Sequence, residues 1–167
     1  MVGSNRSILT LLMPYTYVIH KERRLVVSTA SGRVTFAEIT AHLDQLVREP
    51  DFNPTFNHFI DWTAATSLDI SADEAKAIAK RRDFAPPSRR AFFTTVPSIY
   101  GMLRLTLTHH EMDGARELTC VFYDGKEALA WLGLEGLPDF SKSEGRKLGS
   151  AKDEKSATGG LSFRRGV

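Results

Sequence analysis

Apolar and polar positions follow two different periods along the chain, and together they predict five strands and four helices. Runs rich in β-branched and aromatic residues predict strands at 15–20, 25–30, 58–61, 90–96 and 118–123. Apolar residues that recur every three to four positions predict helices at 35–49, 71–84 and 99–111, and a short fourth helix after Asp124. The element order is therefore β-β-α-β-α-β-α-β-α.

This order predicts an α/β fold with one mixed sheet. The short charged segment Lys21–Arg24 implies an antiparallel hairpin between the first two strands. The later strands alternate with helices, which is typical of parallel strands joined by helical crossovers. We therefore expect a single domain, residues 14–140, with about five strands and four helices.

Several helix ends carry recognisable signals. Thr35–Glu38 and Ser71–Glu74 fit the capping box, and Ser98 and Asp124 are further candidates for N-caps. Pro86–Pro87 forbids continuation of the second helix. The buried stripe of the first helix is predicted from its recurring apolar residues: Phe36, Ile39, Leu43, Leu46 and Val47.

Charge separates the ends of the chain from its body. The net charge of +2 conceals a basic tail, because residues 141–167 hold seven Lys or Arg and only three Asp or Glu. This tail is poor in apolar residues, so we expect it to be disordered, with 1–13 as a loose leader. The body is slightly acidic, which argues against nucleic-acid binding. Without a secretory signal or a run of about 18 apolar residues, the sequence predicts a cytoplasmic protein with no transmembrane segment.

Residues with catalytic or metal-binding chemistry do not form a recognisable motif. The single cysteine, Cys120, lies in an apolar strand and is expected to be an inert core thiol. The pair His109–His110 lacks the i, i+4 spacing that places two imidazoles on one metal, and a solvated helix end is the preferred interpretation. The remaining histidines lie in separate elements. We therefore predict no cofactor, no metal site and no catalytic residue.

Polar residues gather where the third strand is expected to end. Asp61 closes the apolar run, a polar stretch follows, and Ser71 opens the next helix. Open α/β sheets bind ligands outside the carboxyl ends of their strands, and a loop whose side chains bond their own backbone is the equally weighted alternative. The candidate ligand or partner site comprises Asp61, Trp62, Thr66, Ser67, Asp69, Ser71, Ser98 and Tyr100.

Basic residues bracket the loop that contains Pro86–Pro87. They could bind a phosphate, an acidic partner or an anionic membrane surface. A solvated helix end that complements the helix dipole is the preferred alternative. The candidate anion patch comprises Lys80, Arg81, Arg82, Arg89 and Arg90.

The element order, the strand end Ile60–Asp61 before the polar stretch, and the closing phrase Ala128–Gly133 resemble the STAS/SpoIIAA-like proteins over about residues 15–135. These are small bacterial α/β proteins, similar in fold to anti-sigma-factor antagonists and often compared with CRAL-TRIO lipid-binding domains. The resemblance implies the fold and a regulatory rather than a catalytic role.

The resemblance also implies a phosphorylation site, from which this chain departs. In anti-sigma-factor antagonists an aspartate is followed at once by a phosphorylatable serine at the start of the helix after the third strand. Asp69 matches that aspartate and Asp61 matches the one that ends the strand. The next residue here is Ile70, which has no hydroxyl, and Ser71 lies one position later. We expect the switch to be lost, with a phosphorylated Ser71 as the alternative.

Three functions are compatible with these observations, and the one with the least support is an enzyme, which would show convergent titratable groups in one cleft. The leading hypothesis is a non-enzymatic regulatory or protein-interaction module that acts through the loop at 61–71. The alternative is a carrier of a small apolar or lipid-like ligand between helices and sheet, and a homodimer is compatible with either. The alternative depends on a third helix that is apolar around much of its circumference: Tyr100, Met102, Leu103, Leu105 and Leu107. A full core would favour the module, and a deep cavity would favour the carrier.

Overall fold

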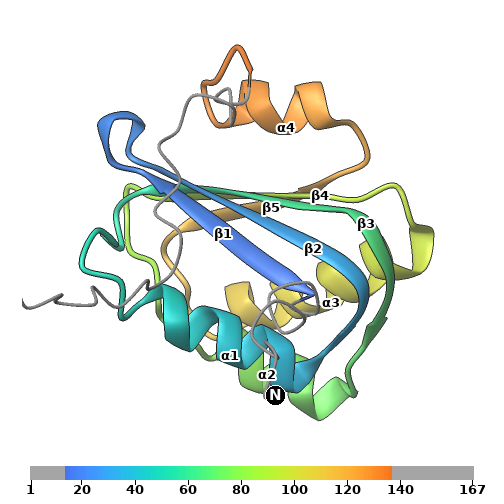
Figure 1. Cartoon of the computed structure of the whole chain (residues 1–167). Helices are drawn as coiled ribbons and strands as arrows, with labels where there is room; N and C mark the ends of the chain where they lie inside the picture. Colours follow the sequence, from blue (N-terminus) through green and yellow to red (C-terminus); the bar gives the residue numbers. More distant parts are fainter. Residues whose placement is uncertain (1–13, 137–167) are drawn as a thin grey trace, which may run out of the picture. The chain divides into compact units, whose positions relative to one another are not determined.

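The computed structural model describes residues 14–136 as one five-stranded sheet with helices on both faces (Figure 1). The predicted leader and the predicted basic tail lie outside the described residues. The elements are β1 (Tyr15–His20), β2 (Leu25–Thr35), α1 (Phe36–Leu46), β3 (Asn57–Asp69), α2 (Ala72–Ala79), β4 (Arg89–Phe93), α3 (Pro97–Met112), β5 (Leu118–Phe122) and α4 (Gly125–Trp131). The predicted element order and α/β class are confirmed.

The strands lie in the sheet in their order along the chain, from β1 to β5. β1 pairs antiparallel with β2, and every later neighbour is parallel, as predicted. A 3-10 turn at Lys21–Arg23, followed by Arg24 in the left-handed conformation (φ 50°), closes the hairpin. β4 therefore lies inside the sheet, in agreement with its apolar sequence.

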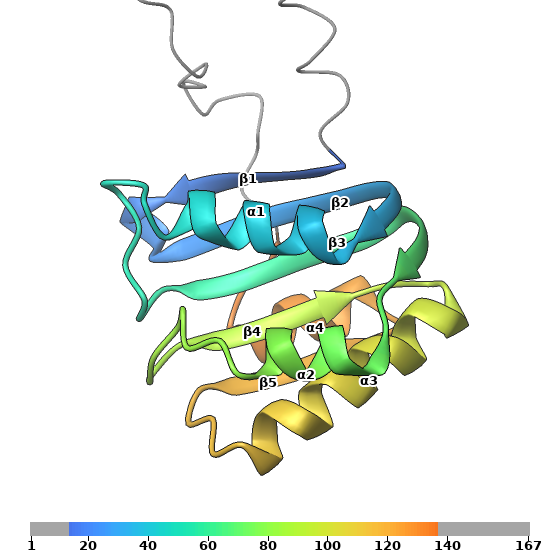
Figure 2. The same cartoon turned by 90° about the horizontal axis from the view of Figure 1, so that it is seen from below.

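Helices cover the two faces unequally. α1, α2 and α3 lie on one face and α4 lies on the other (Figures 1 and 2). On the three-helix face, Ile60 and Trp62 share a buried cluster with Leu103. On the α4 face, Phe59 shares a smaller cluster with Ala128. Alternate side chains of β3 therefore belong to two different hydrophobic clusters, one on each face of the sheet.

β3 is longer than predicted, and its continuation corrects the expected position of the loop. It does not end at Asp61 but runs to Asp69, alongside a β2 that continues to Thr35. Two bulges, opposite Thr29–Ser31 and Gly32–Arg33, each add one residue to β3, so its thirteen residues pair with the eleven of β2. Gly32 has a φ of 63° at the second bulge, which glycine adopts without steric cost. The bulges break the simple alternation, which is why the stretch reads as a loop in the sequence.

Two helix boundaries also differ from the prediction. α2 ends at Ala79 rather than near Phe84, because Phe84 leaves the helix direction and packs into a buried cluster with Val26 and Phe56. In α1, Val47 is 36% exposed and lies outside the buried stripe, whereas His42 is buried within it. The capping box at Thr35 is present as predicted, but two members of the predicted stripe, Phe36 and Val47, are not buried.

Candidate functional site

The predicted site residues on β3 lie along a strand rather than in a loop. Asp61 Oδ1 accepts hydrogen bonds from Thr63 N at 2.8 Å and from Thr63 Oγ1 at 2.6 Å. Asp69 forms an exposed ion pair with Arg33 across the β2–β3 ladder. Thr66 is exposed and Ser67 is half-buried. These polar groups lie at the outer surface of the sheet. The Asp61 carboxylate is already hydrogen-bonded to Thr63, two residues along the chain.

Trp62, unlike its neighbours in the sequence, points into the interior of the protein. It is only 1% exposed, and its ring meets the ring of Tyr15 edge-on, with the centroids 5.5 Å apart. Trp62 is therefore a core residue on the three-helix face.

Ser71 is the N-cap of α2, as expected. Its Oγ accepts a hydrogen bond from Glu74 N at 3.2 Å, and Glu74 Oε2 accepts one from Ser71 N at 2.7 Å. Ile70, at the position where anti-sigma-factor antagonists have their phosphorylated serine, packs against the buried cluster of the three-helix face. The structure therefore gives Ser71 a structural role and gives Ile70 a place in the core.

The start of α3 corrects the role expected for Ser98. The N-cap is Val96, and Pro97 occupies the first helical position, where a fixed φ and a missing N–H are both tolerated. Ser98 is exposed within the first turn and does not cap the helix. Tyr100 is half-buried and stacks on Tyr123, with ring centroids 3.9 Å apart.

The five basic residues of the candidate anion patch do not converge on one surface. Arg81 pairs with Asp44 and Asp83, and Arg82 pairs with Asp113, which leaves these two cations neutralised. Lys80 is exposed at the end of α2.

Arg89 and Arg90 are adjacent on β4, so their side chains point to opposite faces of the sheet. Arg89 is exposed and donates a hydrogen bond to the Trp131 carbonyl at 3.0 Å. Arg90 points under the helices, where its guanidinium lies 4.5 Å from the centroid of Phe84. The sheet therefore separates Arg89 from Arg90, so these two members of the predicted anion patch cannot bind the same anion.

A buried cluster of Ser28, His42 and His58 was not found from the sequence. Ser28 Oγ lies 2.7 Å from His58 Nε2 and 3.2 Å from His42 Nε2, and all three residues are at most 4% exposed. A serine hydroxyl has one hydrogen, so Ser28 donates to one imidazole and accepts from the other. We call these three residues the buried histidine cluster.

Burial keeps both imidazoles of this cluster neutral. It lowers the pKa of His42 to about 4, and the positive charge of Arg90 adds to the effect. The same two causes hold the pKa of His58 well below its usual range. The ring of His42 stacks on Tyr15 at 3.8 Å, and the ring of His58 stacks on Phe84 at 4.9 Å. These aromatic rings separate the cluster from solvent. The cluster is therefore a hydrogen-bond network in the protein interior.

The sequence did contain a signal for this cluster. His42 lies three residues after Ile39, in the apolar stripe of α1, and Ser28 and His58 have the period-2 positions that face inward on β2 and β3. Register then decides the contact, because Ser28 pairs with Ile60, two positions beyond His58. The sequence pattern indicates which residues of each strand and helix face the interior, but it does not give the register in which the strands pair.

His110 corrects another expectation, since it is buried rather than solvated. Its Nε2 lies 2.6 Å from Glu117 Oε1, and its Nδ1 lies 2.6 Å from the Ala79 carbonyl. Arg82 Nη1, which can only donate, also lies 3.4 Å from His110 Nδ1. Burial by itself raises the pKa of Glu117, but hydrogen bonds from its backbone N–H and from His110 hold that pKa below its usual range. The pair ties the end of α3 to α2 and to the start of β5.

Cys120 is half-buried rather than a core thiol. It lines a surface hollow of about 260 Å³ with Trp131 and Leu107. Leu118 and Val121 share β5 with it, but only Val121 points into the three-helix core. The alternation of β5 therefore turns the thiol toward the less covered face.

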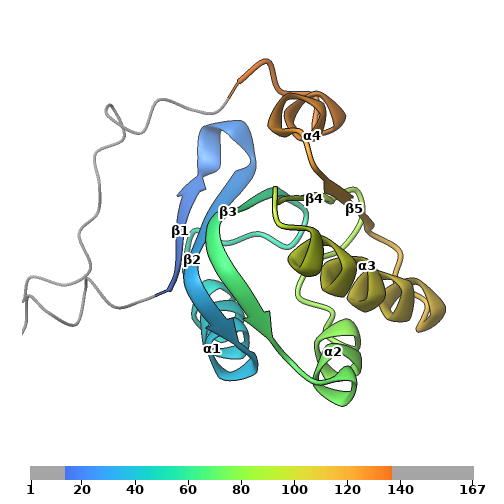
Figure 3. The same ribbon diagram turned by 90° about the vertical axis from the view of Figure 1, so that its right-hand side faces the viewer.

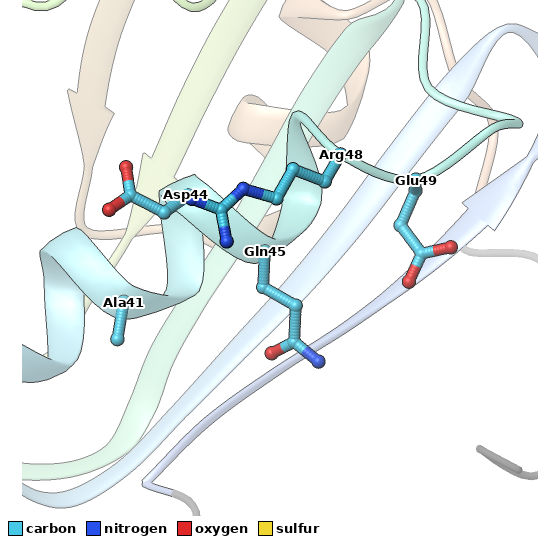
Figure 4. A pocket seen from close by; sticks show the side chains of 5 residues that line it. All are labelled: Ala41, Asp44, Gln45, Arg48 and Glu49. Atoms are coloured by element: carbon cyan, nitrogen blue, oxygen red, sulfur yellow. The ribbon is translucent and has the colours of Figure 1, made fainter.

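Cavities among the described residues fall into two kinds. A hollow of about 420 Å³ is lined by side chains of α1 and of the turn after it, which spread outward from the helix (Figure 4). It contains none of the predicted site residues. The other kind is internal. A much smaller space of about 50 Å³ lies between α1, α2, α3 and the sheet, and we call it the inner cavity. Within residues 14–136, no group of three or more His, Cys, Asp or Glu side chains is placed to hold a metal ion.

Comparison with solved structures finds an uncharacterized protein of the DUF3478 family from Shewanella loihica, described as having a SpoIIAA-like fold. It is 17% identical, the match covers 71% of this chain and 93% of that one, and the TM-score is 0.47. That description names the fold which the sequence resemblance implies, and no function follows from a likeness of this size. No protein-family model matches the chain, and no curated protein does. None of the helices in residues 14–136 is long and apolar enough to cross a bilayer.

Proposed function

We propose that this chain is a non-enzymatic protein-interaction module whose binding surface is the uncovered part of the sheet. This surface, the open sheet face, lies on the α4 side and consists of exposed residues of three strands. Its members are Thr16 of β1, Thr29, Ser31 and Arg33 of β2, and Ala64 and Thr66 of β3.

The observation that supports the proposal is the limited reach of α4. α4 packs on β4 and β5, and its cluster includes only the first part of β2 and β3, at Val27 and Phe59. Figure 3 shows α4 beside β4 and β5 and away from β1. Beyond Val27 and Phe59, no helix among the described residues covers this face.

A parallel ladder with one uncovered face is unusual. Parallel strands occur almost always with both faces covered, because helical crossovers pack on each side. Here the β2–β3 ladder continues through ten paired positions, and its later part exposes Ser31 and Ala64 to solvent. A surface of mostly small side chains on a hydrogen-bonded ladder can accept a partner without loop rearrangement. Three predicted site residues, Asp61, Thr66 and Asp69, lie on or beside it.

The interior supports the module over the lipid carrier. The inner cavity measures about 50 Å³, whereas pockets that hold drug-sized ligands measure roughly 300–1,000 Å³. Ile99, Leu103 and Leu107 of α3 fill the space that a carrier would leave open, and each is at most 8% exposed. Leu105 is 41% exposed and does not line the inner cavity.

The proposal is tested by charging the open sheet face without disturbing the fold. Ala64→Arg places a long cation in the middle of the face, and Ala77→Arg makes the same change on the exposed side of α2. The three proteins should first be shown to melt alike. Quantitative affinity capture from the source organism's extract is then compared.

We expect proteins that bind wild type and Ala77→Arg to be depleted by at least about tenfold on Ala64→Arg, since a misplaced charge at an interface centre costs more than about 1.4 kcal/mol. If the same proteins are recovered at equal levels on all three baits, the open sheet face is not the binding surface. The proposal would then fail.

A further inference from the structure

Arg90 is a half-buried cation that makes no ion-pair contact with any of the described carboxylates. It comes from β4, on the three-helix face. Its Nε is buried and has no hydrogen-bond partner. Two aromatic rings flank the guanidinium, with the centroids of Phe84 and Phe92 at 4.5 Å and 5.5 Å. Aromatic faces offset part of a cation's desolvation, but they leave the Nε–H without a hydrogen-bond acceptor.

Arg90 also lines the inner cavity, so the side chain that carries the unpartnered Nε–H is part of the cavity wall. The cavity walls are otherwise mostly apolar and come from all three helices of this face, with Leu43 from α1, Ile78 from α2 and Leu103 from α3. The polar exceptions are Tyr15 and Thr106. Burial raises the pKa of Tyr15, so its hydroxyl keeps its hydrogen at neutral pH and can donate.

The hydroxyl of Thr106 is already engaged, because it donates to the Met102 carbonyl at 2.9 Å. Arg90 is therefore the dominant donor in the cavity. A guanidinium recognises a carboxylate through two parallel hydrogen bonds, for which the Nε edge of the fork is suited. That edge is the one left without a partner here.

The dimensions of the cavity select among anions. A volume of about 50 Å³ has room for about four water-sized groups. A phosphate ester or a long-chain fatty acid would exceed it. The apolar walls favour an anion with an apolar end over a fully hydrated inorganic ion.

We propose that the inner cavity is a binding site for a short-chain carboxylate of acetate or propionate size, whose carboxylate pairs with Arg90 and whose alkyl end lies against Leu43, Ile78 and Leu103. Leu68, Ile70, Ile78 and Arg90 are half-buried, so the cavity wall is closest to solvent at these residues. The ligand would enter there. The site lies on the opposite face from the open sheet face and is independent of the function proposed above.

The site is tested with the full chain, sodium acetate and sodium propionate as probes, and sodium chloride at equal ionic strength as reference. Arg90→Met removes the guanidinium and keeps an apolar side chain of similar length. Arg89→Met makes the same change at the neighbouring exposed position on the other face. Thermal melting is followed as each salt is titrated.

We expect the carboxylates to raise the Tm of wild type and Arg89→Met saturably, by several degrees. Arg90→Met should lose at least about tenfold in apparent affinity, because a charge-assisted pair of hydrogen bonds is gone. An equal response of Arg90→Met, an equal effect of chloride, or no saturable response to carboxylate would each overturn the assignment.

A second measurement protects the test against a variant that fails to fold. In wild type, we expect the Nε–H of Arg90 to give a proton–nitrogen NMR signal, because burial of Nε slows its exchange with water. Propionate should move this signal saturably to lower field as Nε gains an acceptor. An Nε signal that stays in place at saturating propionate would contradict the site, whatever the variants do.

Discussion

Acid should destabilise this protein between pH 6.5 and 4 through the buried histidine cluster. An unfolded histidine binds a proton near pH 6.5. In the folded protein His42 stays neutral down to a pKa of about 4, because burial and the charge of Arg90 oppose protonation. The unfolded state therefore binds more protons in this window, and the free energy of unfolding falls as the pH is lowered.

The magnitude follows from the difference in pKa. A shift from 6.5 to about 4 corresponds to a loss of about 2 kcal/mol by pH 5 and about 3 kcal/mol by pH 4. His42 is only 4% exposed, so solvent screening does not reduce this figure much. The lowered pKa of His58 acts in the same direction and adds to the loss.

The perturbation is His42→Phe, which keeps an aromatic ring on Tyr15 and removes the titrating group. Ser28 retains its shorter hydrogen bond, to His58 at 2.7 Å. Urea unfolding at pH 7.5, 6.5, 5.5 and 5.0 gives the free energy of unfolding of wild type and variant. The range stops at pH 5 because carboxylates begin to titrate below it.

Wild type should lose about 2 kcal/mol or more between pH 7.5 and 5.0, and His42→Phe should lose about 2 kcal/mol less than wild type over the same range. The variant can be less stable at pH 7.5 without affecting this comparison, since the difference in slope is what is predicted. Equal slopes for the two proteins, or a wild-type stability that does not change with pH, would refute the reasoning.

Two further predictions concern single hydrogen-bonded groups. Glu117→Gln should lower the free energy of unfolding at pH 7 by about 3 kcal/mol, because it breaks the buried pair with His110, while Asp113→Asn, at an exposed pair, should cost less than about 1 kcal/mol. Since the pKa of Glu117 is lowered, its contribution is present above pH 4.5 and is lost as the pH falls through its folded value; equal costs at pH 7 would contradict the assignment. Ser71→Ala should cost about 1 kcal/mol and Ser98→Ala less than about 0.5 kcal/mol, because only Ser71 caps a helix. Chemical denaturation that ranks the two serines in the opposite order would show that the capping assignment is wrong.

The fold was predictable from local signals, since hairpin length, strand–helix alternation and capping residues are all short-range properties. The capping box at Ser71 and the cap at Asp124 are present as expected. What failed depended on distant partners. β3 continues past Asp61 because β2 continues beside it, and bulges disguise its alternation.

The polar interior was beyond sequence analysis for a related reason. His110 is recognisable as a buried ion-pair partner only when Glu117 is seen to fold back against it. Arg90 looked like part of a surface patch, because alternation within β4 fixes two opposite faces without saying which face Arg90 takes. Tertiary contacts, rather than local propensity, decide both cases.

Site-specific photo-crosslinking tests the central claim most directly. A photoreactive phenylalanine analogue is introduced at Thr66 on the open sheet face, and at Ala77 on α2 as the control, in the organism's own cells. The proposed function predicts a discrete protein adduct from position 66 that position 77 does not give and that Ala64→Arg abolishes. Adducts that are equal at both positions, or unchanged by Ala64→Arg, would contradict the claim that this protein acts through the open sheet face.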